Sequence, residues 1–159
     1  MLAVTLAGCG GGGKTVQQSP SPTVTIPHKT VALGKQAYDR TMKRLGRQLA
    51  DSVAQLFPLA AALPGSDVNK ESLAKLKRTR AVVTDVMASV AGIAPPEPIR
   101  AEHQRLLKGI SALGGELDEL IQVEEQGASK DHPFNARFSS IRTIAKARSA
   151  MAKKGYEIG

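Results

Sequence analysis

The chain has 159 residues, enough for one domain with its own core, and its 42% hydrophobic content excludes a wholly disordered protein. Aromatic residues make up only 3%, which favours packed helices of Leu, Ile, Val, Met and Ala over a β-sandwich. No stretch of the sequence reaches the roughly 18 apolar residues that a membrane-spanning helix needs. The single Cys excludes an internal disulfide, and the net charge of +8 favours an anionic partner.

The chain opens with a short apolar segment that ends in small residues before Cys9. Such a segment before a cleavage point is typical of a secretory signal peptide. The four residues Leu6-Ala7-Gly8-Cys9 resemble the lipobox of bacterial lipoproteins. The resemblance implies cleavage before Cys9, diacylglycerol on its sulfur and a place on the extracytoplasmic face of the cell membrane. Because no Lys or Arg precedes this short apolar segment, we expect residues 1–8 to be a lipoprotein signal peptide truncated at its N-terminus. The alternative is that Met1 is the true start, in which case export is not expected.

A second motif overlaps the first, because Gly8 to Thr15 match the phosphate-binding pattern Gly-x-x-x-x-Gly-Lys-Thr. That loop binds nucleotides only when a helix follows it directly and turns its N-terminal N–H groups toward the phosphate. Pro20, Pro22 and Pro27 exclude a long helix there, and no alternation of strands and helices follows. We therefore expect no nucleotide site and interpret residues 9–30 as a lipidated Cys followed by a flexible Gly, Ser and Pro linker.

Residues 31–159 are predicted to form one helical domain, because apolar residues recur there at three- and four-residue steps. The first stripe ends at Pro58 and contains Tyr38, Met42, Leu45, Leu49, Val53 and Leu56. The second begins near Asp67 or Asn69, ends at Gly92 and contains Leu73, Leu76, Thr79 or Arg80, Val83, Met87 and Val90.

The third stripe follows Pro96 or Pro98, ends at Gly127 and contains Ile99, His103, Leu106, Ile110, Leu113, Leu117 and Leu120. The fourth helix is expected to begin after Pro133 and to end at Gly155, with an inner stripe of Phe134, Phe138, Ile141, Ala145 and Met151. Four such segments joined by short turns predict an all-α fold, an antiparallel up-down four-helix bundle. Residues 97–127 carry three basic and seven acidic residues, so we expect ion pairs between this helix and its basic neighbours.

His103 occupies a position in the third stripe that should be apolar. Two interpretations stay open: a ligand or proton-transfer group beside a pocket, or a core histidine that is hydrogen-bonded across the bundle to Tyr38. The sequence has only three histidines and no Glu-x-x-His pair, so we expect neither a metal nor another cofactor.

The last predicted helix is strongly basic and is a weak candidate for binding an anionic surface. Its cationic residues are Arg137, Arg142, Lys146, Arg148, Lys153 and Lys154. Aromatic residues that could stack on bases are nearly absent, which argues against nucleic acid. The expected function is therefore a non-enzymatic binding or structural domain in the cell envelope. Its partners would be the membrane, through lipid on Cys9, and an anionic lipid, a wall polymer or an envelope protein. The alternative is a small-molecule-binding or catalytic bundle with its pocket near His103.

Overall fold

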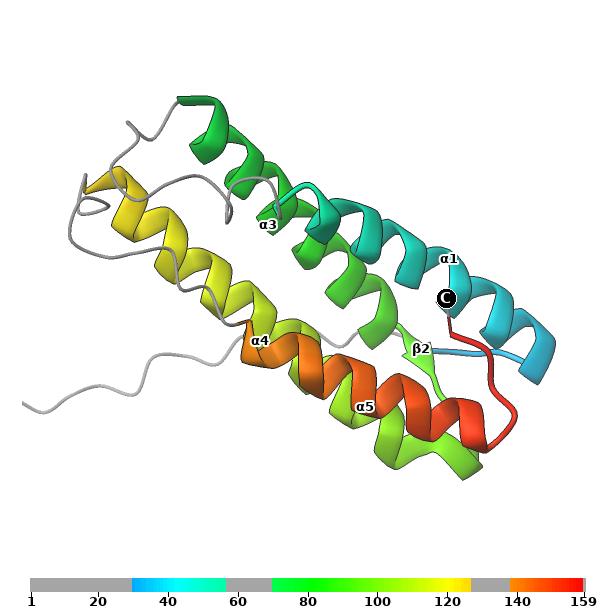
Figure 1. The fold of residues 1–159 in the computed structure, drawn as a ribbon. Helices are drawn as coiled ribbons and strands as arrows, with labels where there is room; N and C mark the ends of the chain where they lie inside the picture. The colour runs from blue at the N-terminus through cyan, green and yellow to red at the C-terminus, as the bar shows by residue number, and fades with distance from the viewer. Residues whose placement is uncertain (1–29, 57–69, 127–137, 159) are drawn as a thin grey trace, which may run out of the picture.

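The structure is a computed structural model that describes residues 30–56, 70–126 and 138–158. These residues contain four α-helices: α1 (Lys35–Ala54), α3 (Lys70–Ala91), α4 (Arg100–Glu125) and α5 (Ser139–Lys153). A 3-10 turn, η1 (Glu97–Ile99), leads into α4, and two short strands, β1 (Val31–Ala32) and β2 (Ile93–Ala94), pair with each other. Successive helices run in opposite directions, as Figure 1 shows. The all-α antiparallel bundle that the sequence predicts is confirmed.

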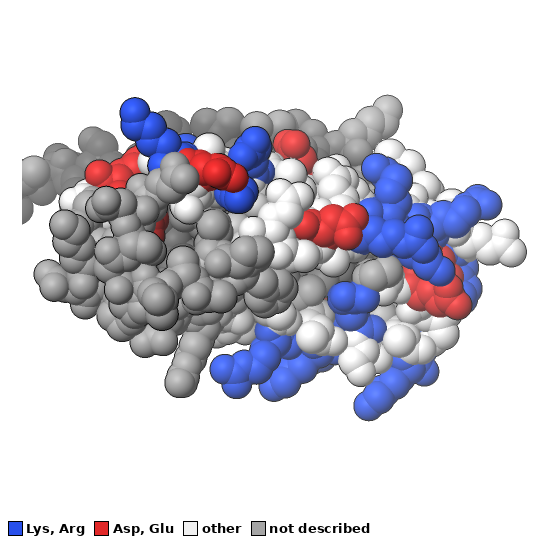
Figure 2. Space-filling view, turned by 45° about the horizontal axis from the view of Figure 1, so that its top comes forward, with Lys and Arg blue, Asp and Glu red and all other residues white. Residues whose placement is uncertain are grey.

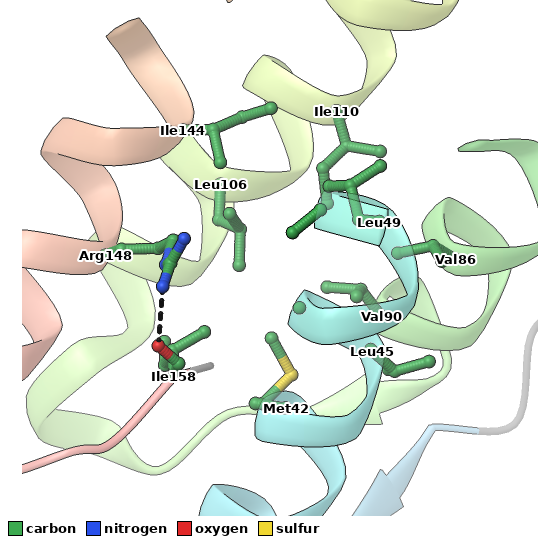
Figure 3. Close-up of a pocket in the computed structure, with 12 residues that line it drawn as sticks. Met42, Leu45, Leu49, Val86, Val90, Leu106, Ile110, Ile144, Arg148 and Ile158 are labelled. Carbon is green, nitrogen blue, oxygen red and sulfur yellow. Dashed lines mark hydrogen bonds between the residues drawn. The ribbon is translucent and has the colours of Figure 1, made fainter. Parts of the chain in front are cut away.

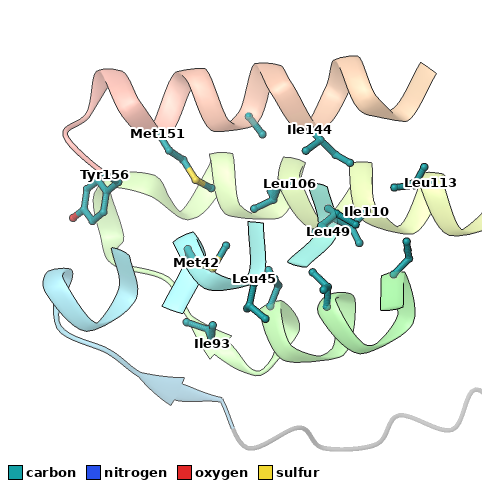
Figure 4. Close-up of a cluster of buried hydrophobic side chains, with 14 of the residues drawn as sticks. Met42, Leu45, Leu49, Ile93, Leu106, Ile110, Leu113, Ile144, Met151 and Tyr156 are labelled. Carbon is teal, nitrogen blue, oxygen red and sulfur yellow. The ribbon is translucent and has the colours of Figure 1, made fainter. Parts of the chain in front are cut away.

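The helices pack in chain order: α1 against α3, α3 against α4, and α4 against α5. The short helix α5 covers only the half of α4 that follows η1 (Figure 1). Aliphatic side chains from all four helices form one core cluster, which also includes Ile93 and, at one end, Tyr156 (Figure 4). No helix among the described residues is long and apolar enough to cross a membrane.

The stripes of α1 and α4 lie where the sequence predicts them. Tyr38 and Leu45 of α1 are buried, and Val53 packs against the core as a partly buried side chain. The predicted positions from Ile99, the last residue of η1, to Leu117 of α4 are all buried. Thr79 fills the gap in the stripe of α3, where its hydroxyl donates a 3.2 Å hydrogen bond to the carbonyl of Ser52.

The prediction for the last helix is wrong in two respects. The helix begins at Ser139, later than expected, and the predicted inner residue Ala145 is exposed while Ile141 is only half-buried. Its buried residues are Ser140, Ile144, Ala147 and Met151, and Phe134 lies outside the described residues. The physical reason is a close approach of two helices at Gly109, where an added Cβ would lie 2.8 Å from Ile144 Cγ1.

A carboxylate from α4 caps the first turn of α5. Glu116 Oε1 accepts hydrogen bonds from Ser139 Oγ at 2.7 Å and from the Ser140 backbone N–H at 3.1 Å. Glu116 Oε2 accepts a third, of 2.5 Å, from Ser140 Oγ. The first N–H groups of a helix have no partner within the helix, and a negative charge there is favoured by the helix dipole. The start of α5 is therefore fixed by a residue of another helix.

Ion pairs join the acidic helix α4 to its neighbours, as expected from the charge distribution. Arg80 of α3 donates two hydrogen bonds to Asp118, of 2.8 and 2.9 Å. Lys77 contacts Glu125 at 2.6 Å. Each such exposed pair contributes at most about 1 kcal/mol, so these contacts select the neighbours of α4 more than they drive folding.

Both ends of the described chain are attached at the same end of the bundle. Val31 and Ala32 pair in parallel with Ile93 and Ala94, which follow α3. At the other terminus Gly155 has a φ of +78°, the left-handed cap expected there, and it turns the chain back toward α1 (Figure 1).

Candidate functional site

Tyr38 and His103 form a buried hydrogen-bonded pair between α1 and α4. Tyr38 Oη lies 2.9 Å from His103 Nδ1, and the two side chains are 0% and 1% exposed. Burial lowers the pKa of His103, while a backbone hydrogen bond with Val90 acts in the opposite direction. Burial also raises the pKa of Tyr38. Both groups are therefore neutral near pH 7.

The Tyr38 ring is closed off by the chain that follows α5. Tyr156 packs edge-on against it, with ring centroids 5.9 Å apart and planes at 90°. The ammonium group of Lys35 lies 5.0 Å from the centroid of the Tyr156 ring. This enclosure places the His103 pair inside the core and leaves it no contact with the cavity described next.

An apolar cavity of about 60 Å³ lies between α1 and α5, further along the bundle than His103. Figure 3 shows aliphatic side chains from all four helices converging on it, among them Leu49, Val90, Leu106, Ile110 and Ile144. Gly46 of α1 also lines it, while Arg148 and Ile158 lie together at its edge. The sequence analysis did not find this cavity, although a glycine beside the apolar stripe of α1 was a visible signal.

The six basic residues predicted as one anionic-surface site do not act as one group. Arg142, Lys146 and Lys153 are exposed on α5 and have no carboxylate partner among the described residues. Lys154 instead contacts the buried side chain of Glu102 at 3.0 Å, and Arg148 donates a 3.1 Å hydrogen bond to the carbonyl of Ile158. The remaining residue, Arg137, lies outside the described residues.

A second basic surface lies on α1. Arg40, Arg44 and Arg47 are exposed and, within the described ranges, have no acidic partner. They surround a shallow hollow together with Lys43, Gln48 and Asp51. Figure 2 shows Lys and Arg side chains gathered at the right of the view, with Asp and Glu side chains among them.

The remaining sequence candidates lie outside the described residues: Cys9, the glycine-rich motif from Gly8 to Thr15, and the two other histidines, His28 and His132. In the part of the chain that the structure describes, no three His, Cys, Asp or Glu side chains come together as a metal site would require.

Comparison with known proteins adds no assignment. No protein-family model matches the chain, and it has no significant match among the curated proteins or the solved structures.

Proposed function

We propose that this chain is an envelope lipoprotein, anchored through lipid on Cys9, whose helical domain is a non-enzymatic binding module for an anionic surface. The observation that carries the proposal is the set of exposed cations on α5 and α1 without a carboxylate partner among the described residues. They are Arg142, Lys146, Lys153, Arg40, Arg44 and Arg47.

These cations attract an anionic membrane strongly only if the domain is held close to it. Each Lys or Arg close to an anionic membrane attracts it by about 1 kcal/mol, within a Debye length of roughly 8 Å at physiological salt. A lipid anchor would hold the domain near that surface, so several weak contacts could act together. Acidic side chains of α4 pair with Arg80 and Lys77 of α3, whereas the six cations named above pair with no carboxylate among the described residues.

The pair at the bundle core supports binding over catalysis. His103 and Tyr38 satisfy each other, and neither side chain is accessible to a substrate. The alternative of a catalytic pocket at His103 is therefore not proposed.

The anchor is tested by expressing the chain with its natural upstream sequence in a bacterial host and separating membrane from soluble fractions. The parent chain should be processed and found with the membrane. A Cys9→Ser variant should remain unprocessed or move to the soluble fraction. Membrane retention and normal processing of Cys9→Ser would contradict the lipoprotein assignment.

The surface is tested by sedimentation of the unlipidated chain with anionic and with neutral vesicles. We expect binding to anionic vesicles alone, weakened by added salt. Replacing Arg142, Lys146 and Lys153 by Gln should weaken it more than replacing three paired lysines by Gln. These charge-matched controls are Lys35, Lys75 and Lys77, each of which contacts a carboxylate.

Two results would contradict this part of the proposal. The first is no binding to anionic vesicles at low salt. The second is an equal loss in the two triple variants, because it would mean that net charge alone attracts the domain and no particular face does.

A further inference from the structure

The seam between α1 and α5 is the one side of the bundle where consecutive packing leaves two helices without an extensive contact. The cavity lies in this seam, and its volume is about 60 Å³. One water-sized group needs about 10–15 Å³ of such space, so the cavity has room for roughly four to six of them. That is the size of a short stretch of an alkyl chain.

Water is a poor occupant of this space. Its walls are aliphatic side chains and the backbone at Gly46, with Leu106 and Ile110 at its base. A buried water needs two to four polar partners, and apolar cavities without them stay dry and take up apolar molecules. Filling the space with carbon would regain the dispersion contacts that its lining now lacks.

Among the described residues, no carboxylate pairs with the cation at the edge of the cavity. Arg148 is half-buried, and its only hydrogen bond within the described chain goes to the neutral carbonyl of Ile158, at 3.1 Å. A guanidinium group has five N–H donors and prefers a carboxylate or phosphate.

We propose that this seam binds a single-chain anionic amphiphile: the end of its alkyl tail fills the cavity, and its head group pairs with Arg148. The inference rests on the proposed role as a binding module and gives that role a site. A free fatty acid and one chain of an anionic membrane lipid share this chemistry.

The size of the cavity favours such a chain over a protein partner. An amphipathic helix that docks in a groove uses several apolar anchors spaced along it. The seam offers one compact cavity with one adjacent half-buried cation, which matches one tail and one head group.

The test uses the full chain and octanoate, kept below its micelle concentration, with methyl NMR as the readout. Octanoate should shift the methyl signals of Leu106, Ile110 and Ile144 in a saturable way. Gly46→Leu should fill the cavity and abolish these shifts while the chain stays folded, because Leu is a better helix former than Gly. The matched control is Gly115→Leu, since Gly115 has open space around it.

The head-group contact is tested by comparing octanoate with octanol. Arg148→Gln should weaken octanoate binding about tenfold, the effect of losing one charge-assisted hydrogen bond, and should leave octanol binding within about twofold. Arg78→Gln, on the exposed side of α3 and not among the residues that line the cavity, should leave both unchanged.

Several outcomes would overturn the proposal. They are no saturable shift with octanoate, equal octanoate binding by Gly46→Leu, and shifts at these methyl groups with an acidic amphipathic peptide but not with octanoate. Vesicle binding by the parent chain without any octanoate response would reject the cavity site yet leave the basic-surface function standing. If octanoate binds, a loss of anionic vesicle binding in Gly46→Leu identifies a membrane lipid as the source, and retention identifies a free amphiphile.

Discussion

The hydroxyl of Tyr38 and Nδ1 of His103 are 65 residues apart in sequence and 2.9 Å apart in the core. Burial shifts both pKa values toward the neutral forms, so the contact is a hydrogen bond between uncharged groups in apolar surroundings. Such a bond adds little to the free energy of unfolding, but removing one partner leaves the other group buried without a hydrogen bond.

Tyr38→Phe is therefore expected to lower the free energy of unfolding by about 1–3 kcal/mol. Urea denaturation of the two proteins measures this difference. The control is Tyr156→Phe, because the Tyr156 hydroxyl has no hydrogen-bond partner within the described residues, and its loss should cost less than ~0.5 kcal/mol. Equal losses of stability in the two variants would show that the hydrogen bond from Tyr38 to His103 does not stabilise the fold.

Stability should fall as the pH drops below about 6.5, the ordinary pKa of the imidazole. The folded-state pKa of His103 lies below that value, so the unfolded chain takes up a proton that the folded chain does not. The free energy of unfolding is measured between about pH 5.5 and pH 7.5 for the parent and for His103→Asn. The variant should show a shallower slope. Parallel slopes would mean that other groups cause the dependence.

Removal of the carboxylate that caps α5 should destabilise the domain. Glu116→Ala is expected to cost about 1–2 kcal/mol, the usual effect of losing a helix cap. The control is Glu119→Ala, an exposed carboxylate on the same helix, which should change stability by less than ~0.5 kcal/mol. Thermal melting followed by circular dichroism compares them. If Glu116→Ala leaves the stability unchanged, water must replace the carboxylate as the cap of α5 at no cost in free energy.

Two glycines of α4 should respond oppositely to the same substitution. A Cβ at Gly109 would lie 2.8 Å from Ile144 Cγ1 and 3.2 Å from its backbone N, so Gly109→Ala must push α5 away. The expected cost is about 1–3 kcal/mol. Gly115 has no atom within 4 Å of such a Cβ, so Gly115→Ala should stabilise the domain by about 0.5–1 kcal/mol. If Gly109→Ala is as stable as the parent chain, α4 and α5 do not approach each other as closely as described.

The buried residues of α1 and α4 could be predicted from the sequence because both helices are long and have one face that is buried along its length. There the apolar period coincides with burial, and even the polar exception His103 was correctly paired with Tyr38 as one of two open interpretations. A long amphipathic helix allows such inference, since one face must turn to the core.

The inner face of α5 and the cavity could not be predicted from the sequence, for two different reasons. The inner face of α5 depends on Gly109 and Glu116, which belong to another helix, and small residues such as Ser140 and Ala147 become buried only through that contact. The cavity is space left between four helices. No single side chain determines the position of this cavity, so it can be located only once the packing of the four helices is known.

The pairing of β1 with β2 has a mechanical consequence. Any pull on the chain before residue 30 passes through β1 and reaches the bond from the Val31 N–H to the Gly92 carbonyl before it reaches α1. This short pairing therefore lies between any force on the chain before residue 30 and the unwinding of α1.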